Sequence, residues 1–231
     1  MRPGVEPATL PRCRRIRAID RHGRFVTFEG GEGAGKSTQI ARLADALGAA
    51  GIAVHRTREP GGSPGAEEIR SLIVTGSADR WDARTEALLI AAARRDHVER
   101  TVRPNLAAGR WVLSDRFTDS TMAYQGIAGG VGADAVDWLR RFAVEDLAPD
   151  LTIVLDLPPT LGLAREAARP GAAQRFEKLG IAFHERLRAA FLAIAEREPR
   201  RCAVVDARPP VDDVFAAVRQ VVRERLQVAL P

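Results

Sequence analysis

Lysine and cysteine are both scarce in this chain of 231 residues. Only two of its 35 basic residues are lysines, Lys36 and Lys178, and the rest are arginines. The two cysteines, Cys13 and Cys202, lie far apart and predict neither a disulfide framework nor a metal site. No apolar run approaches the roughly 20 residues that a membrane-spanning helix needs. The composition therefore predicts a protein of the reducing cytoplasm, without a membrane segment.

The positive charge of the chain is concentrated in one short segment. The formal net charge is +5, and residues 1–24 alone contain seven arginines against only Glu6 and Asp20. The remaining residues carry 28 basic and 28 acidic side chains, so they are electrically balanced. We interpret residues 1–23 as a disordered basic tail and residues 24–231 as one domain. Such a tail could bind RNA or an anionic surface, but a solvated tail is the simpler interpretation, so we predict no nucleic-acid partner.

Strand and helix patterns alternate from Arg24 onward. Five short apolar runs predict buried strands, at residues 25–29, 52–57, 111–115, 151–156 and 203–206. Helical periodicity fills most of the intervals, at residues 36–49, 66–74, 83–107, 133–147, 176–196 and 211–226. This alternation predicts an α/β fold with a five-stranded parallel sheet and helices on both faces.

A phosphate-binding motif follows the first predicted strand and precedes the first predicted helix. Its residues match G-x-x-x-x-G-K-[S/T] and are Gly30, Gly31, Glu32, Gly33, Ala34, Gly35, Lys36 and Ser37. Glycines let the backbone N–H groups wrap around phosphate oxygens at a helix N-terminus. Lys36 reaches the β- and γ-phosphates in such a loop, and the hydroxyl of Ser37 binds Mg²⁺. The motif predicts binding of a nucleoside triphosphate in a fold of the P-loop NTPase type.

Other classes of nucleotide-binding protein lack their signatures here. A GTPase needs an Asn-Lys-x-Asp type element, but the single asparagine, Asn105, is followed by Leu106. A hydrolytic ATPase usually has a glutamate after the acidic residue of its second motif, whereas Asp115 is followed by Arg116. A small-molecule phosphotransferase needs neither element, because its acceptor supplies the nucleophile.

A phosphotransferase needs cations for a second phosphate and a lid that excludes water. Arg58 and Arg116 follow predicted strands, where ligands bind in parallel sheets, and Arg94 lies in a helix. A helical lid is predicted at about residues 160–175, where Arg165 and Arg169 precede a turn at Pro170-Gly171.

Several longer motifs resemble those of bacterial thymidylate kinases. They are FEGGEGAGKSTQ at 28–39, TREPGG at 57–62, SDRFTDSTMAYQG at 114–126, PDLT at 149–152 leading to Asp156, and RFE at 175–177. The resemblance runs in order from about Arg24 to Leu226. The second and third motifs are much more specific than the phosphate-binding loop.

The resemblance implies transfer of the γ-phosphoryl group of ATP to dTMP, giving dTDP and ADP for dTTP synthesis, with Mg²⁺ and as a homodimer. It implies ATP-binding residues Gly30, Gly31, Glu32, Gly33, Ala34, Gly35, Lys36, Ser37 and Thr38. It implies dTMP-binding residues Arg58, Glu59, Pro60, Arg94, Arg116, Ser120, Thr121, Tyr124 and Gln125. It implies Ser37 and Asp115 at the metal, and Lys36, Arg169, Arg165 and Asp115 in catalysis.

Glu32 indicates the subtype. Family members with glutamate inside the phosphate-binding loop carry the catalytic arginine in the lid, so Arg169 is the first candidate and Arg165 the second. The chain departs from the family at Ile90, where a phenylalanine that stacks on thymine is frequent. It departs also at Phe117, Ala167 and Gln174. A kinase for a different base, and a protein that binds ATP without turnover, remain the alternatives.

Overall fold

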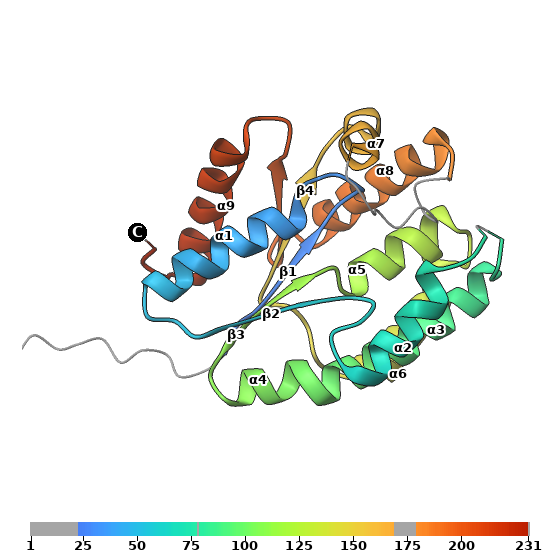
Figure 1. The fold of residues 1–231 in the computed structure, drawn as a ribbon, viewed down its shortest axis with the longest axis horizontal. Coiled ribbons are helices and arrows are strands. Elements are labelled where there is room, and N and C mark those ends of the chain that lie inside the picture. Colours follow the sequence, from blue (N-terminus) through green and yellow to red (C-terminus); the bar gives the residue numbers. More distant parts are fainter. Residues whose placement is uncertain (1–22, 78, 169–178, 231) are drawn as a thin grey trace, which may run out of the picture.

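A parallel five-stranded sheet runs through the computed structural model, which describes residues 23–77, 79–168 and 179–230 (Figure 1). Its strands are β1 (Phe25–Glu29), β2 (Val54–Arg58), β3 (Trp111–Asp115), β4 (Leu151–Asp156) and β5 (Cys202–Asp206). They lie in the order β2-β3-β1-β4-β5, and all neighbours are parallel. The predicted sheet is confirmed, and β1, which leads into the phosphate-binding loop, is its central strand.

The helical elements fill the connections between strands. They are α1 (Lys36–Ala49), α2 (Pro64–Val74), α3 (Ala83–His97), η1 (Val98–Val102), α4 (Arg103–Ala107), α5 (Thr118–Thr121), η2 (Met122–Ala128), α6 (Ala133–Val144), α7 (Pro159–Ala167), α8 (Ile181–Arg197) and α9 (Val211–Leu226). η1 and η2 are π-helical segments that continue the helices before them. None of the helices in the described ranges is long and apolar enough to cross a membrane.

Helices cover both faces of the sheet because the side chains of each strand alternate between them. Val26 and Phe28 of β1 pack on one face in a core with α1 and α9. Phe25 points to the other face and packs with η1, α6 and the ring of Phe117. On that second face, α8 and η2 cover β4 and β5. The carboxyl ends of the strands point toward α5 and α7 (Figure 1).

Some predicted boundaries need correction. The second strand was predicted at 52–57 but spans Val54–Arg58. Helix α6 ends at Val144, three residues before the predicted end, because Glu145 has a positive φ of 57°. Helix α8 begins at Ile181, and the predicted helical residues 176–178 lie outside the described ranges.

One helical segment differs from the sequence prediction, and the described part of the lid is helical as predicted. Residues 118–128 form α5 and η2, where no helix was predicted. Their buried polar side chains bond to other elements: Ser120 to Glu29, Thr121 to Arg94 and Asp119 to Arg201. In the predicted lid, α7 occupies Pro159–Ala167, whereas residues 169–175, including Arg169 and Gln174, lie outside the described part. Residues 1–22 of the predicted tail lie outside it as well.

Candidate active site

The phosphate-binding loop joins β1 to α1, as predicted, and Lys36 is buried within it. The Lys36 side chain donates hydrogen bonds to the carbonyl oxygens of Gly30 (3.1 Å) and Gly31 (2.9 Å). Burial, and then the charge of Arg116, lower the pKa of Lys36. Gly33 has a φ of 65°, and a Cβ there would lie 2.1 Å from the Gly162 carbonyl oxygen. The loop therefore needs glycine at this close approach to α7.

Ser37 and Asp115 supply two oxygen donors beside the loop. The Ser37 hydroxyl donates to Asp115 Oδ2 at 2.8 Å, which joins the start of α1 to the end of β3. Hydroxyl and carboxylate oxygens are ligands that Mg²⁺ accepts, so this pair fits the ion. In the described ranges, no group of three or more His, Cys, Asp or Glu could hold a metal.

Arg116, Glu32 and Tyr124 form a partly buried polar cluster. Arg116 Nη2 lies 3.0 and 3.1 Å from the two Glu32 carboxylate oxygens, and its guanidinium stacks 4.9 Å from the centre of the Tyr124 ring. The Tyr124 hydroxyl donates to Glu32 Oε1 at 2.5 Å. Burial alone would raise the pKa of Glu32, but the charges of Arg116 and Lys36 and the Tyr124 hydrogen bond lower it to about 2. Glu32 is thus a fixed negative charge that holds Arg116 in place.

Arg94 is held by a second buried network. Its side chain is 4% exposed, and its Nε donates to Glu59 Oε2 at 2.6 Å. Its Nη2 donates to the carbonyl oxygen of Phe117 and to Thr121 Oγ1. The other Glu59 oxygen lies 2.8 Å from His97 Nδ1. Glu59 therefore orients Arg94 from behind.

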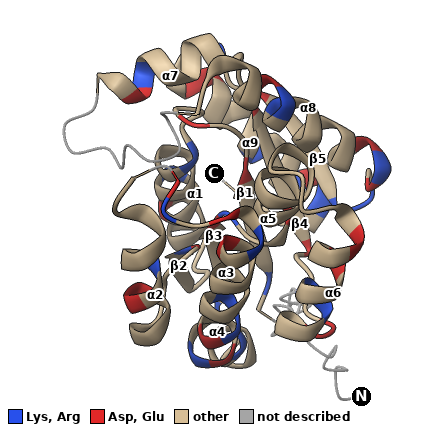
Figure 2. Cartoon of the chain, turned by 90° about the vertical axis from the view of Figure 1, so that its right-hand side faces the viewer, with Lys and Arg blue, Asp and Glu red and all other residues tan. Residues whose placement is uncertain are grey.

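Two hollows meet at the carboxyl ends of the strands. The larger, of about 1120 Å³, is lined by the loop residues Glu32, Gly33, Ala34, Gly35, Lys36, Ser37 and Thr38, and by Asp115 and Arg58. The smaller, of about 150 Å³, is lined by Glu59, Pro60, Ile90, Arg94, Phe117, Ser120, Thr121, Tyr124 and Gln125. Four residues line both hollows: Glu32, Glu59, Arg70 and Arg116. Figure 2 looks onto this edge of the sheet, where acidic and basic residues lie close together around β1 and β3.

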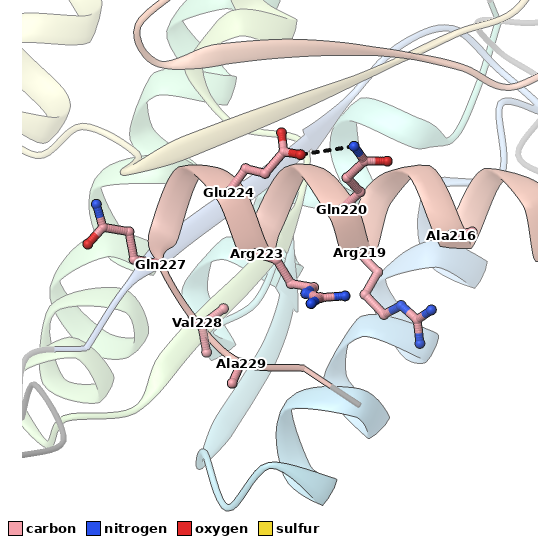
Figure 3. Close-up of a pocket in the computed structure, with 8 residues that line it drawn as sticks. All are labelled: Ala216, Arg219, Gln220, Arg223, Glu224, Gln227, Val228 and Ala229. Atoms are coloured by element: carbon pink, nitrogen blue, oxygen red, sulfur yellow. Dashed lines mark hydrogen bonds between the residues drawn. The ribbon is translucent and has the colours of Figure 1, made fainter. Parts of the chain in front are cut away.

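A third hollow, of about 700 Å³, lies beside the last turns of α9 (Figure 3). Gln220 and Glu224 lie on one side of the helix and share a 2.9 Å hydrogen bond, while Arg219 and Arg223 point to the other side. The first residue of α9, Val211, lines the larger hollow. The third hollow is therefore at the far end of this 16-residue helix, away from the strand ends.

Comparison with known proteins agrees with this geometry. Residues 28–218 match the family model described as thymidylate kinase. The thymidylate kinase of Caulobacter vibrioides is 60% identical over 204 residues, which cover 88% of this chain and 98% of that protein. That of Magnetococcus marinus is 52% identical, with 90% and 99% covered. The chain belongs to the thymidylate kinase family. The crystal structure of thymidylate kinase from Ehrlichia chaffeensis is similar, with a TM-score of 0.72, 31% identity, and 87% and 99% covered.

Membership of the thymidylate kinase family makes the chain a nucleoside monophosphate kinase, and the matched residues include both hollows. Of the predicted dTMP-binding residues, all except Arg58 line the smaller hollow. Arg58 lines the larger one instead and pairs with Glu67 at 3.1 Å. Arg165 also lines the larger hollow, where it donates to the carbonyl oxygen of Ala207 at 3.1 Å.

The sequence analysis did not identify two residues at the smaller hollow of this thymidylate kinase family member. Arg70 lines the hollow, and Glu86 contacts a residue that lines it. Arg70 lines both hollows and donates to the Pro60 carbonyl oxygen at 2.7 Å. Glu86 is buried and accepts a hydrogen bond from Gln125 Nε2 at 2.6 Å. No motif distinguishes Arg70 among so many arginines, but Glu86 gave a signal, because a glutamate within the apolar stripe of a helix is rarely buried without a partner.

Proposed function

We propose that the protein transfers the γ-phosphoryl group of ATP to dTMP in the cytoplasm, giving ADP and dTDP for dTTP synthesis. The observation that carries this proposal is the meeting of the two hollows at Glu32, Arg70 and Arg116. ATP in the larger hollow and a nucleoside monophosphate in the smaller one would bring their phosphates together at these residues. In-line transfer needs this proximity.

The phosphate-binding loop would hold the donor. Its backbone N–H groups and Lys36 would bind the β- and γ-phosphates. Ser37 and Asp115 would hold Mg²⁺, which would offset the negative charge of the phosphates. Because Lys36 already lies buried between the carbonyls of Gly30 and Gly31, its ammonium is positioned before the nucleotide arrives.

The smaller hollow would hold dTMP. Arg116 would bind its phosphate through the planar guanidinium, and Arg70 lies at the same junction. Arg94 and Gln125 would hydrogen-bond the thymine, and Tyr124 would lie beside the sugar and disfavour a 2′-hydroxyl. Ile90, 7% exposed, replaces the aromatic ring expected against the base.

A lid arginine would complete the charge stabilisation of the transferred phosphoryl group. Arg169 remains the first candidate of the sequence analysis and lies outside the described residues. Arg165, the second candidate, lines the larger hollow. Glu32 supports a catalytic arginine in the lid. It places a carboxylate, which pairs with Arg116, inside the phosphate-binding loop.

A panel of acceptors tests the function directly. With ATP and Mg²⁺, we expect ADP release with dTMP to exceed that with UMP, CMP, AMP or GMP by at least 100-fold in kcat/KM, a difference of about 2.7 kcal/mol. Preference over dUMP should be smaller, since one methyl group in an apolar pocket contributes about 1–3 kcal/mol. A coupled ADP-release assay measures both. ATP binding without turnover of any acceptor would contradict the proposal, and preference for another base would assign a different kinase.

We also propose that two copies associate through α6. Trp138 and Phe142 are 63% and 74% exposed and stack with ring centres 5.6 Å apart. Leu88 of the neighbouring α3 is 57% exposed. Large apolar side chains exposed together are typical of protein interfaces, and a two-fold axis through such a patch would pair it with itself.

Charge on this patch should separate the copies. We expect the wild-type protein to elute as a dimer at micromolar concentration and the double variant Trp138→Glu, Phe142→Glu as a folded monomer, because four buried carboxylates would face one another. Light scattering after size exclusion measures the mass. Leu161→Glu, at a 47% exposed site on α7, is the matched control and should leave the dimer intact. A monomeric wild type would refute the interface.

A further inference from the structure

Glu29, the last residue of β1, is a fully buried carboxylate directly beneath the phosphate-binding residues. Its Oε1 accepts the backbone N–H of Phe117 at 2.8 Å, and its Oε2 accepts the hydroxyl of Ser120 at 2.5 Å. Both partners belong to the segment that follows β3 and carries Arg116. Glu29 therefore connects the central strand to the turn that presents Arg116.

That turn has an unusual backbone. Arg116 has a φ of 72°, in the left-handed region that residues other than glycine seldom adopt. The Arg116 N–H donates to the carbonyl oxygen of Phe28 at 2.9 Å, and the next N–H, of Phe117, donates to Glu29. Two consecutive residues of β1, Phe28 and Glu29, therefore accept the two consecutive N–H groups of this turn. Without Glu29 the Phe117 N–H would be buried and unpaired, which is costly.

Glu29 also sets the direction of the hydrogen bond between Ser120 and Arg116. An ionised carboxylate can only accept hydrogen bonds, so the Ser120 hydroxyl is the donor in its hydrogen bond to Glu29. The Ser120 oxygen is then an acceptor, and Arg116 Nη1 donates to it at 3.1 Å. The same Nη1 donates to the carbonyl oxygen of Gly30 at 3.1 Å, while Nη2 contacts Glu32. The guanidinium is thereby held on three sides.

The charge of this carboxylate is unfavourable where it lies. Burial, and then the nearby charge of Asp119, raise the pKa of Glu29 to about 7, although Arg116 opposes the shift. Lys36 is a second cation whose charge interacts with it. An amide or apolar side chain would avoid this cost, so a glutamate that serves only to fill the core is poorly explained.

We propose that Glu29 is a positioning residue for the acceptor phosphate: it holds the turn at Arg116 and orients Ser120, so that the guanidinium of Arg116 faces the smaller hollow. This inference rests on the proposed function, in which Arg116 binds the phosphate of the acceptor. Glu29 itself does not line either hollow.

The variant Glu29→Gln tests the proposal, because it keeps the size and removes the charge. At pH 8, where the wild-type carboxylate is ionised, the amide would donate to Ser120 and reverse that bond. We expect the KM for dTMP to rise about tenfold, which corresponds to about 1.4 kcal/mol. The KM for ATP should stay within about twofold, and the melting temperature should not fall, since a buried charge has been removed.

Thr27→Val is the matched control, because Thr27 lies two residues earlier on the same side of β1, is buried and hydrogen-bonds Thr152 Oγ1 rather than Ser120 or Phe117. It should leave the KM for dTMP unchanged. A double-mutant cycle adds an independent readout. If Glu29 acts through Ser120, adding Glu29→Gln to the Ser120→Ala variant should raise the KM for dTMP little further.

The proposal is overturned if folded Glu29→Gln retains the wild-type KM for dTMP, or if its effect adds fully to that of Ser120→Ala. If Glu29→Gln does not fold, Ser120→Ala alone must still raise the KM for dTMP. An unchanged KM would refute the proposal that Glu29 acts on Arg116 through Ser120. Wild-type turnover of dTMP keeps these results separate from the proposed function, which stands or falls on the acceptor panel.

Discussion

Arg116→Ala is expected to lower kcat/KM for dTMP by roughly 10³-fold, the largest loss among the acceptor-side residues. Two charge-assisted hydrogen bonds from one guanidinium to a phosphate contribute about 1.5–3 kcal/mol each. Arg116 has a side chain only 16% exposed, so water screens the interaction little. The loss should appear mainly in the KM for dTMP, because the proposed role of Arg116, which lines both hollows, is to bind the phosphate of the acceptor. Steady-state kinetics over a range of dTMP concentrations measure it.

The control for Arg116 must separate binding from stability. Arg116→Ala also leaves the carboxylate of Glu32 without its cation, so the pKa of Glu32 should rise and the protein should lose stability. Adding Glu32→Gln should restore the melting temperature but not the activity. Arg116→Lys keeps the charge and loses the planar fork, so it should recover only part of the rate. An Arg116→Ala enzyme within tenfold of wild type would refute the phosphate-binding role.

Lys36→Met should lower kcat roughly 10²–10³-fold, as removal of a single charge-stabilising donor does in other enzymes. The methionine side chain has a similar length, so the buried space stays filled, but no ammonium remains to offset charge on the transferred phosphate. The KM for dTMP should change less than threefold, because Lys36 lines only the larger hollow. Single-turnover measurements with saturating ATP would isolate the chemical step.

Lys36→Arg is the matched control for this prediction. It retains the charge, but the guanidinium is too large for a site in which Lys36 is 7% exposed and bonded to two loop carbonyls. We expect it to be nearly as slow as Lys36→Met. Wild-type kcat in either variant would mean that the loop amides alone stabilise the donor phosphates.

Sequence patterns predicted the central elements better than the peripheral ones. β1, β3 and β4 lie inside the sheet and are almost fully buried, so their sequences are mostly apolar up to the acidic residue that ends each strand. β2 is an edge strand that is only half buried, so its apolar signal is weak and its predicted start was two residues early. Residues 118–128 are rich in small polar side chains, and their helix depends on contacts that a local pattern does not contain.

The sequence by itself determined the phosphate-binding loop, the parallel sheet and the family, because motif spacing and periodicity are local properties of the chain. Only the tertiary structure decided how the site is held. Glu32 meets Arg116 across 84 positions, and Glu29 meets Ser120 across 91. These pairs exist because the order of the strands places β3 beside β1. Strand order arises from long crossover connections and shared burial, so no spacing within the sequence encodes which buried carboxylate supports which arginine.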